Sequence, residues 1–208
     1  MLTAIALYEG LTVLDAIGPY AVLSHVPDAD VVFCAEKRGR LSDDNGLLHI
    51  EVETDFGEIG RPDVVLVPGG GASRLLDKPG TPIVEWIREA HQHSTWTTSV
   101  CTGALLLGAA GVLDGLDATT HWMFYDNLAA FGANPTAERV VHRGKVITAA
   151  GVSAGIDMAL YLVGQIAGDE TAQAIQLGIE YDPQPPYDSG SPAKASPEIR
   201  ELVRSLNG

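Results

Sequence analysis

The sequence predicts an α/β protein in which helices cover both faces of a mostly parallel β-sheet. Short apolar runs rich in β-branched residues alternate along the chain with longer stretches of helical period. The apolar runs are nearly continuous, which is typical of strands buried on both faces. Because strand and helix alternate, right-handed crossovers are expected to place helices on the two sides of one sheet.

The predicted elements follow one another in a regular order. Buried strands are expected at residues 2–8, 30–35, 63–68 and 96–100, and helices at 14–25, 81–93, 102–111 and 153–167. Two segments are expected to be antiparallel: residues 46–54 alternate like an edge strand, and residues 139–149 predict a hairpin that turns at Arg143-Gly144. An irregular, proline-containing arm at about 181–192 precedes a last helix at 197–206.

Length, composition and charge narrow the class of protein. The 208 residues, 46% hydrophobic and 19% charged, predict one globular domain spanning 1–208. A net charge of −14 without a basic run argues against binding to nucleic acid. Neither a basic leader nor an apolar run of roughly 20 residues is present, so no membrane association is expected. The two cysteines lack metal-type spacing and predict free thiols in a reducing cytoplasm.

Cys101 occupies the most informative position in the chain. It follows the predicted strand that ends at Val100 and precedes a strongly helical run that begins at Ala104. A side chain on such a turn is exposed above the carboxyl edge of the sheet, and the helix N-terminus favours a thiolate. The alternative is a small buried apolar residue, which is also how we interpret Cys34 in the middle of its strand.

A glycine-rich loop, Pro68-Gly69-Gly70-Gly71, follows another predicted strand. Backbone N–H groups of Gly70 and Gly71 beside a nucleophile would form an oxyanion hole. The alternative is a flexible turn between a strand and a helix. The loop becomes a candidate functional element only because Cys101 follows the end of a second predicted strand.

Three further side chains are candidates for acid–base chemistry. Asp15 lies among apolar residues, where burial raises a carboxyl pKa and lets the protonated group donate a hydrogen bond to a thiolate. It would otherwise serve the dipole of its helix. His121 is a candidate base for a Cys–His pair, with Asp157 to orient it, unless both are structural. No cluster has metal-ligand spacing, so neither a metal nor another cofactor is expected.

The pieces VLDAIGP, VPGGG, SVCTGALLLGAAGVLDG, ATTHW and VITAAGVSAGIDMAL, in this order, resemble the ThiJ/PfpI superfamily of the class I glutamine amidotransferase-like fold. The resemblance covers nearly the whole chain. It implies a flavodoxin-like three-layer α/β/α sandwich, a cysteine on a nucleophile elbow and assembly as a homodimer.

Within that superfamily the chain is similar to the isocyanide hydratases, in LD followed by GP, in CTG and in the tail IEYDPQPPYDSGSP. That resemblance implies that Cys101 is the nucleophile and Asp15 the general acid/base, with Thr102 a near neighbour. It also implies that the loop with Ala150 and Val152 walls the pocket for a small-molecule substrate. The implied reaction adds water to an isocyanide through a cysteine thioimidate and releases an N-substituted formamide.

Two other functions stay open at the level of sequence. One is a different cysteine-dependent reaction on small molecules, such as glyoxalase-like or amidase chemistry. Protease and amidase members of the superfamily carry a histidine directly after the cysteine, where this chain has Thr102. The other is a non-catalytic sensor in which Cys101 is oxidised or binds a ligand.

Overall fold

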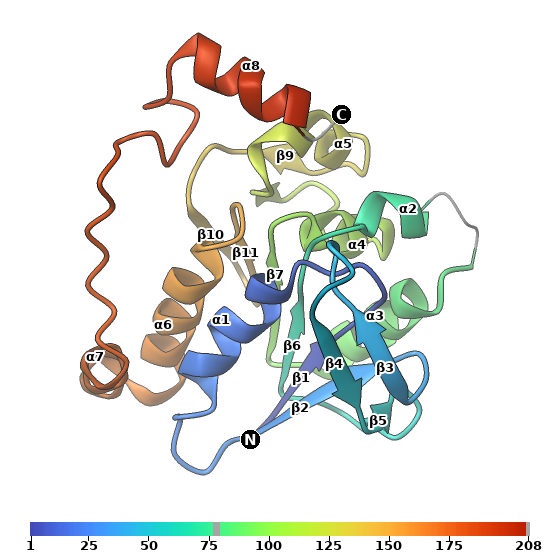
Figure 1. The fold of residues 1–208 in the computed structure, drawn as a ribbon. Coiled ribbons are helices and arrows are strands. Elements are labelled where there is room, and N and C mark those ends of the chain that lie inside the picture. The colour runs from blue at the N-terminus through green and yellow to red at the C-terminus, as the bar shows by residue number, and fades with distance from the viewer. Residues whose placement is uncertain (77–79, 207–208) are drawn as a thin grey trace.

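The computed structural model describes residues 1–76 and 80–206, which are built around one seven-stranded sheet (Figure 1). The strand order is β10-β11-β7-β6-β1-β2-β5. Neighbouring strands are parallel except for the antiparallel pair β10–β11. The strands are β1 (Leu2–Ala6), β2 (Asp30–Ala35), β5 (Thr54–Asp55), β6 (Val64–Val67), β7 (Trp96–Val100), β10 (Val140–Arg143) and β11 (Val146–Ala149). The mostly parallel sheet predicted from the sequence is confirmed.

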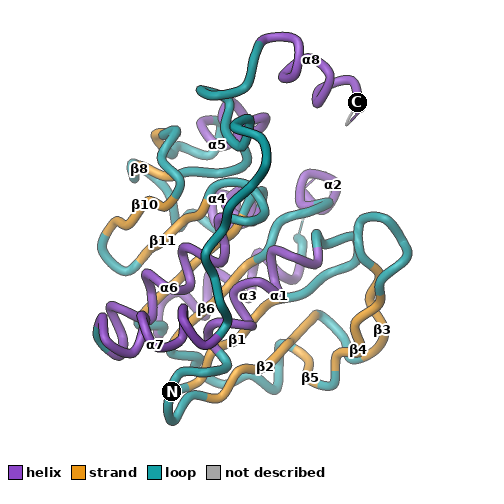
Figure 2. The backbone as a smooth tube through the Cα atoms, turned by 60° about the vertical axis from the view of Figure 1, so that its left-hand side comes forward, coloured by secondary structure: helices purple, strands orange, loops and turns teal. Residues whose placement is uncertain are grey.

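Helices flank the sheet as a three-layer sandwich requires (Figures 1 and 2). On one side α1 packs on α6 and α6 on α7, and on the other α3 packs on α4. These helices are α1 (Val13–Leu23), α3 (Pro82–His93), α4 (Gly103–Ala109), α6 (Ala154–Ala167) and α7 (Asp169–Gly178). Shorter helical segments are α2 (Ala72–Leu76), a 3-10 helix (Trp122–Phe124) and α5 (Tyr125–Ala129). Among the described residues, no helix combines the length and apolar character needed to cross a bilayer.

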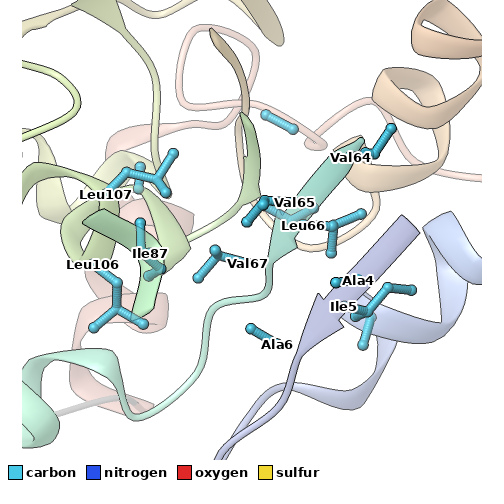
Figure 3. Packing of buried hydrophobic residues seen from close by; sticks show 14 of the residues in the cluster. Ala4, Ile5, Ala6, Val64, Val65, Leu66, Val67, Ile87, Leu106 and Leu107 are labelled. Carbon is cyan, nitrogen blue, oxygen red and sulfur yellow. The ribbon is translucent and has the colours of Figure 1, made fainter. Parts of the chain in front are cut away.

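The middle of the sheet forms the centre of the hydrophobic core (Figure 3). Every residue of β6 is fully buried, so both faces of this strand pack against protein. Ile87 of α3 and Leu106 and Leu107 of α4 are likewise fully buried and belong to the same cluster. Burial on both faces explains the continuous apolar pattern of the strand. It also fixes the carboxyl ends of β1, β6 and β7, from which the loops of the site begin.

The region after β2 differs from the sequence prediction. The segment predicted as an edge strand contains β4 (His49–Val52), which pairs antiparallel with β3 (Gly39–Ser42) in a separate two-stranded sheet. The edge of the main sheet is instead β5, parallel to β2. Alternation correctly indicated a half-buried strand, but it carries no information about the partner strand.

Two further regions contain structure that the sequence did not predict. The left-handed conformation of Gly168, with φ of +86°, ends α6 and lets the chain turn into α7. A small parallel pair joins β8 (Asp117–Ala118) to β9 (Asn134–Pro135). By contrast, the hairpin predicted at 139–149 is confirmed as β10–β11, although Arg143 pairs with Val146, so the turn lies at Gly144-Lys145 and not at Arg143-Gly144.

The C-terminal segment runs along the outside of the molecule (Figures 1 and 2). Residues 181–192 contain no helix or strand and lead from α7 to α8 (Pro197–Leu206). The guanidinium of Arg204 on α8 lies 5.3 Å from the ring centroid of Trp122, a cation–π contact. This contact links the last helix to the end of the molecule that carries α5.

Candidate active site

Cys101 lies at a strained turn between β7 and α4. Its φ of +55° lies in the left-handed region that side chains with a Cβ rarely adopt. The turn is held from both sides, because the Cys101 N–H donates to the carbonyls of Ala149 (3.1 Å) and Ala150 (2.9 Å), while the Thr120 hydroxyl donates to the Cys101 carbonyl at 2.9 Å. A Cβ on Gly103 would lie 2.1 Å from the Val67 carbonyl oxygen, so only glycine fits after this turn. The predicted elbow is thus present in the structure.

Asp15 projects from the first turn of α1 and is fully buried. Its Oδ2 accepts the N–H of Gly69 at 2.9 Å. The Cys101 thiol interacts with the same carboxyl group. Its Oδ1 is buried and has no hydrogen-bond partner in the described part of the chain. Burial raises the pKa of Asp15 to about 7, although the Gly69 N–H and the thiol act in the opposite direction.

The ionisation of Cys101 differs from the sequence-based expectation of a thiolate. Burial, reinforced by the charge of Asp15, raises the thiol pKa to about 12. The N–H groups of Val152 and Thr102 and the Thr102 hydroxyl lower it, but by less than burial raises it. The expectation was wrong because Cys101 is only 5% exposed. In addition, α4, whose N-terminus was expected to stabilise a thiolate, has only seven residues. The free protein therefore holds a thiol beside a carboxyl group whose pKa lies near neutrality.

The glycine loop supports the site but offers no oxyanion hole. The Gly69 N–H donates to Asp15, the Gly70 N–H to the Thr102 hydroxyl at 2.9 Å and the Gly71 N–H to the Gly10 carbonyl at 2.8 Å. The predicted oxyanion role of Gly70 and Gly71 is therefore wrong, because both N–H groups are already used within the protein. The glycines are needed for space: a Cβ on Gly69 would lie 2.7 Å from the Asp15 carboxylate.

Thr102 and the loop before α6 complete the surroundings of the sulfur. The Thr102 hydroxyl can donate its one proton either to the Gly70 carbonyl, at 3.1 Å, or to the Cys101 sulfur. Val152 presents its N–H to the sulfur from a backbone with φ of +26°, again in the left-handed region. Ala150 contributes its carbonyl to the Cys101 N–H. The structure thus brings Thr102, Ala150 and Val152 to Cys101, together with Asp15.

His121 and Asp157 do not form a relay to the cysteine. A Cβ on Gly151 would lie 2.9 Å from the His121 ring, so the ring packs on the loop that carries Val152. His121 Nδ1 accepts the Met123 N–H at 3.4 Å, and burial lowers the pKa of His121. Asp157 forms an ion pair with Arg139 instead of orienting the histidine. His121 therefore packs against the loop before α6, and the interpretation of Asp157 as its orienting group was wrong.

Tyr8 and Asp44 belong to the site but were missed from the sequence. The Tyr8 hydroxyl donates to the Pro68 carbonyl at 3.0 Å, and its pKa is raised by burial and by the charges of Asp15, Cys101 and Asp44. Asp44 accepts a hydrogen bond from the Thr12 hydroxyl at 2.6 Å and raises the pKa of Asp15. The position of Tyr8 just beyond β1 was the available signal, because parallel strands bring their carboxyl ends to one edge.

The second cysteine and the acidic side chains suggest no metal centre. Cys34 and Cys101 are both free thiols. Within residues 1–76 and 80–206, no group of three or more histidine, cysteine or acidic residues is arranged to hold a metal ion. The chemistry available at the site is therefore that of a thiol, a buried carboxyl group and the N–H groups that face the sulfur.

Comparison with known proteins gives consistent matches. Residues 3–165 match the DJ-1/PfpI family. The chain is 41% identical over 199 residues to the isonitrile hydratase of Pseudomonas putida, covering 95% of this chain and 86% of that protein. The crystal structure of a ThiJ/PfpI family protein from Pseudomonas syringae superposes with a TM-score of 0.93 at 36% identity, covering 99% of this chain and 85% of that one. Drosophila melanogaster DJ-1beta shares the fold alone, with a TM-score of 0.78 at 19% identity over 88% of this chain and 98% of that one.

Proposed function

The chain belongs to the DJ-1/PfpI family, and we propose that it is a cysteine-dependent enzyme that adds water to an isocyanide and releases an N-substituted formamide. The observation that carries this proposal is the pair formed by the Cys101 thiol and the buried Asp15 carboxyl group, whose Oδ1 has no partner in the described residues. Similarity to an isonitrile hydratase over 95% of the chain supports the choice of reaction.

In the first step the pair supplies a nucleophile and a proton. Ionised Asp15 takes the thiol proton as the Cys101 sulfur attacks the isocyanide carbon, which becomes carbanion-like as the C–S bond forms. Asp15 then delivers that proton to the same carbon, giving a thioimidate, R–N=CH–S–Cys101. One proton moves from sulfur to carbon and Asp15 is left ionised. The unpartnered Oδ1 is the atom available for this transfer.

In the second step the same carboxylate directs the attack of water. Hydroxide from the water adds to the thioimidate carbon, and the remaining proton reaches the nitrogen through Asp15. The tetrahedral intermediate, R–NH–CH(OH)–S–Cys101, collapses to the formamide, and the hydroxyl proton returns to the sulfur. The N–H groups of Thr102 and Val152 stabilise the departing thiolate. No atom beyond substrate, water and the pair is required.

The charges around the pair favour an uncharged substrate. Asp44 acts on both Asp15 and Tyr8, and it bears the same sign as ionised Asp15. An anionic substrate would be repelled by these acidic groups, whereas an isocyanide carries no net charge.

A substrate panel tests the proposal and separates it from the alternatives. The purified protein is offered an alkyl isocyanide, a 2-oxoaldehyde and a simple primary amide in parallel, and products are identified by NMR. We expect saturable conversion of the isocyanide to its formamide, and neither of the other compounds turned over at a comparable kcat/KM. Turnover of the aldehyde or amide with an unchanged isocyanide would contradict the proposal, as would no turnover at all.

Two properties implied by the resemblance are kept as part of this proposal. We propose a homodimer, which light scattering after gel filtration measures as about twice the 21.9 kDa of the chain. We also propose a reducing, cytoplasmic setting, in keeping with two free buried cysteines. A monomer at working concentration would contradict the first, and export of the protein the second.

A further inference from the structure

A cavity separate from the catalytic pair lies at the same edge of the sheet, and Tyr8 is one of its lining residues. Its volume is about 280 Å³. The lining comes from the segments that follow β1, β2 and β5, from β3, and from the facing ends of α2 and α3. The lining residues are Leu7, Tyr8, Glu9, Ala35, Glu36, Lys37, Leu41, Phe56, Leu75, Thr81, Pro82 and Ile83. Neither Cys101 nor Asp15 is among them, so the cavity is distinct from the site described above.

The chemistry of the lining is mainly apolar. Aliphatic and aromatic side chains from six separate segments of the chain converge on the cavity, among them Leu41, Phe56 and Ile83. Phe56 is held in place from outside by a stack on Trp86, with ring centroids 4.8 Å apart. Part of this wall is anchored in the hydrophobic core, because Leu7, Tyr8, Ala35 and Ile83 are buried members of the core cluster. A preformed apolar hollow at the carboxyl edge of an α/β sheet is a typical small-molecule site.

The charged and hydroxyl side chains of the lining already have partners within the protein. Glu9 accepts the Ser42 N–H at 3.0 Å, and Glu36 pairs with Lys37 at 3.7 Å. The Thr81 hydroxyl donates to the Leu75 carbonyl at 2.9 Å, and the Tyr8 hydroxyl donates to Pro68. Glu36 and Lys37 remain largely exposed to solvent, with side-chain exposures of 54% and 84%, so a charged ligand would lose hydration without gaining a buried counter-ion here. An uncharged apolar molecule loses little and gains contacts with the wall.

We propose that this cavity is a binding site for a small, uncharged and mainly apolar molecule about the size of one aromatic ring. An apolar cavity of roughly 150 Å³ is large enough to hold benzene, and this one is larger. Tyr8 lines the cavity, its hydroxyl is fixed by the hydrogen bond to Pro68, and neither Cys101 nor Asp15 reaches the lining. A molecule seated in the cavity is thus separated from the Cys101 sulfur, and its binding does not depend on the proposed reaction.

Fluorobenzene, observed by ¹⁹F NMR, tests this site in solution. We expect saturable line broadening with the wild-type protein and at least a tenfold rise in Kd for Leu41→Trp, whose indole fills part of the cavity. The matched control is Leu48→Trp, the same substitution at an exposed leucine outside the lining, and its Kd is expected to stay within twofold of wild type. Absence of saturable binding, or equal Kd values for the two tryptophan variants, would overturn the proposal.

Two further measurements keep the test decisive if Leu41→Trp folds poorly. Crystals of the wild-type protein soaked in bromobenzene are expected to show an anomalous bromine peak between Tyr8, Phe56 and Ile83. Cys101→Ala is expected to bind fluorobenzene as the wild type does, because Cys101 does not line the cavity. A bromine peak beside Cys101, or loss of binding in Cys101→Ala, would assign the probe to the catalytic site and refute a second one.

Discussion

The two cysteines of this chain are alike in burial and ionisation but differ in their neighbours. Burial raises the pKa of Cys34, in the middle of β2, to about 12, and the pKa of Cys101, at the end of β7, is raised to about the same value. The Cys34 thiol donates to the Ile5 carbonyl at 3.7 Å, and burial raises its pKa. Cys101 faces a carboxyl group and two N–H groups from a strained turn. Burial and pKa do not distinguish a nucleophile from a core residue, whereas a neighbour able to take its proton does.

The largest expected effect separates the two thiols directly. Cys101→Ala should abolish isocyanide turnover while the protein stays folded, because the attacking atom is lost. Cys34→Ala should keep its kcat/KM and lose about 1 to 3 kcal/mol of stability, because it leaves a small cavity in the core. Kinetic assays and urea unfolding of both variants check this, and retained turnover in Cys101→Ala would remove the basis of the comparison.

Asp15→Asn tests whether the neighbour is what distinguishes Cys101. The amide keeps the shape of the side chain but can neither accept the thiol proton nor deliver it to carbon. We expect kcat/KM to fall by about 10² to 10⁴, measured as formamide production at pH 8. Near-normal kcat/KM in this variant would contradict the role of Asp15.

The stability of Asp15→Asn tests the raised pKa of Asp15 independently of activity. The pKa of Asp15 is raised from 3.8 to about 7, so between these values the native state binds more protons than the unfolded state. Wild-type stability therefore falls as pH rises from about 4 to about 7. Asp15→Asn lacks this loss and is expected to be more stable than the wild type at pH 8, by up to roughly 4 kcal/mol. A variant less stable than the wild type at pH 8 would show that the ionised carboxylate of Asp15 does not destabilise the folded protein.

Gly69→Ala tests the loop that holds the carboxyl group. The new Cβ would lie 2.6 Å from the Thr102 nitrogen and 2.7 Å from Asp15 Oδ2, so the pair must move apart. A misplacement of this size is expected to lower kcat/KM by about 10². Gly60→Ala is the matched control, because its Cβ would meet nothing within 4 Å. Equal activity of the two variants would show that the Gly69 contact does not position the pair.

The smallest expected effect is the pH dependence of the wild-type reaction. The active form carries one proton on the pair, and a second proton on Asp15 blocks removal of the thiol proton. Because the pKa of Asp15 is about 7, kcat/KM should rise with pH through a midpoint near 7 and be about tenfold below its plateau at pH 6. A profile that is flat or falls between pH 5.5 and 8.5 would contradict this protonation scheme.

The strands and the elbow were predictable because they depend on local pattern. β2 and β7 have the predicted bounds, 30–35 and 96–100, since continuous β-branched runs ended by turn residues define buried strands. Cys101 followed from the place where β7 ends. The burial of Asp15 was inferred from the apolar residues around it and is confirmed at 0% exposure.

The rest of the site depends on contacts between distant segments, which local pattern does not encode. The sequence shows three glycines in a row but not that Asp15, Thr102 and Gly10 accept their N–H groups. It shows Asp157 and Arg139 but not that these two residues, 18 positions apart, form an ion pair. The direction of the Cys101 pKa shift depends on how deeply the elbow is buried, and the role of β3 depends on its pairing with β4.

The most direct test of the central claim is the mass of the protein during turnover. Wild-type protein is mixed with an alkyl isocyanide, quenched in acid within milliseconds to seconds and analysed by peptide mass spectrometry. The account predicts that the peptide with Cys101 transiently gains the full mass of the isocyanide, as a thioimidate requires, while the peptide with Cys34 is unchanged. Formamide production with no adduct at any time point, or an adduct on Cys34 alone, would contradict it.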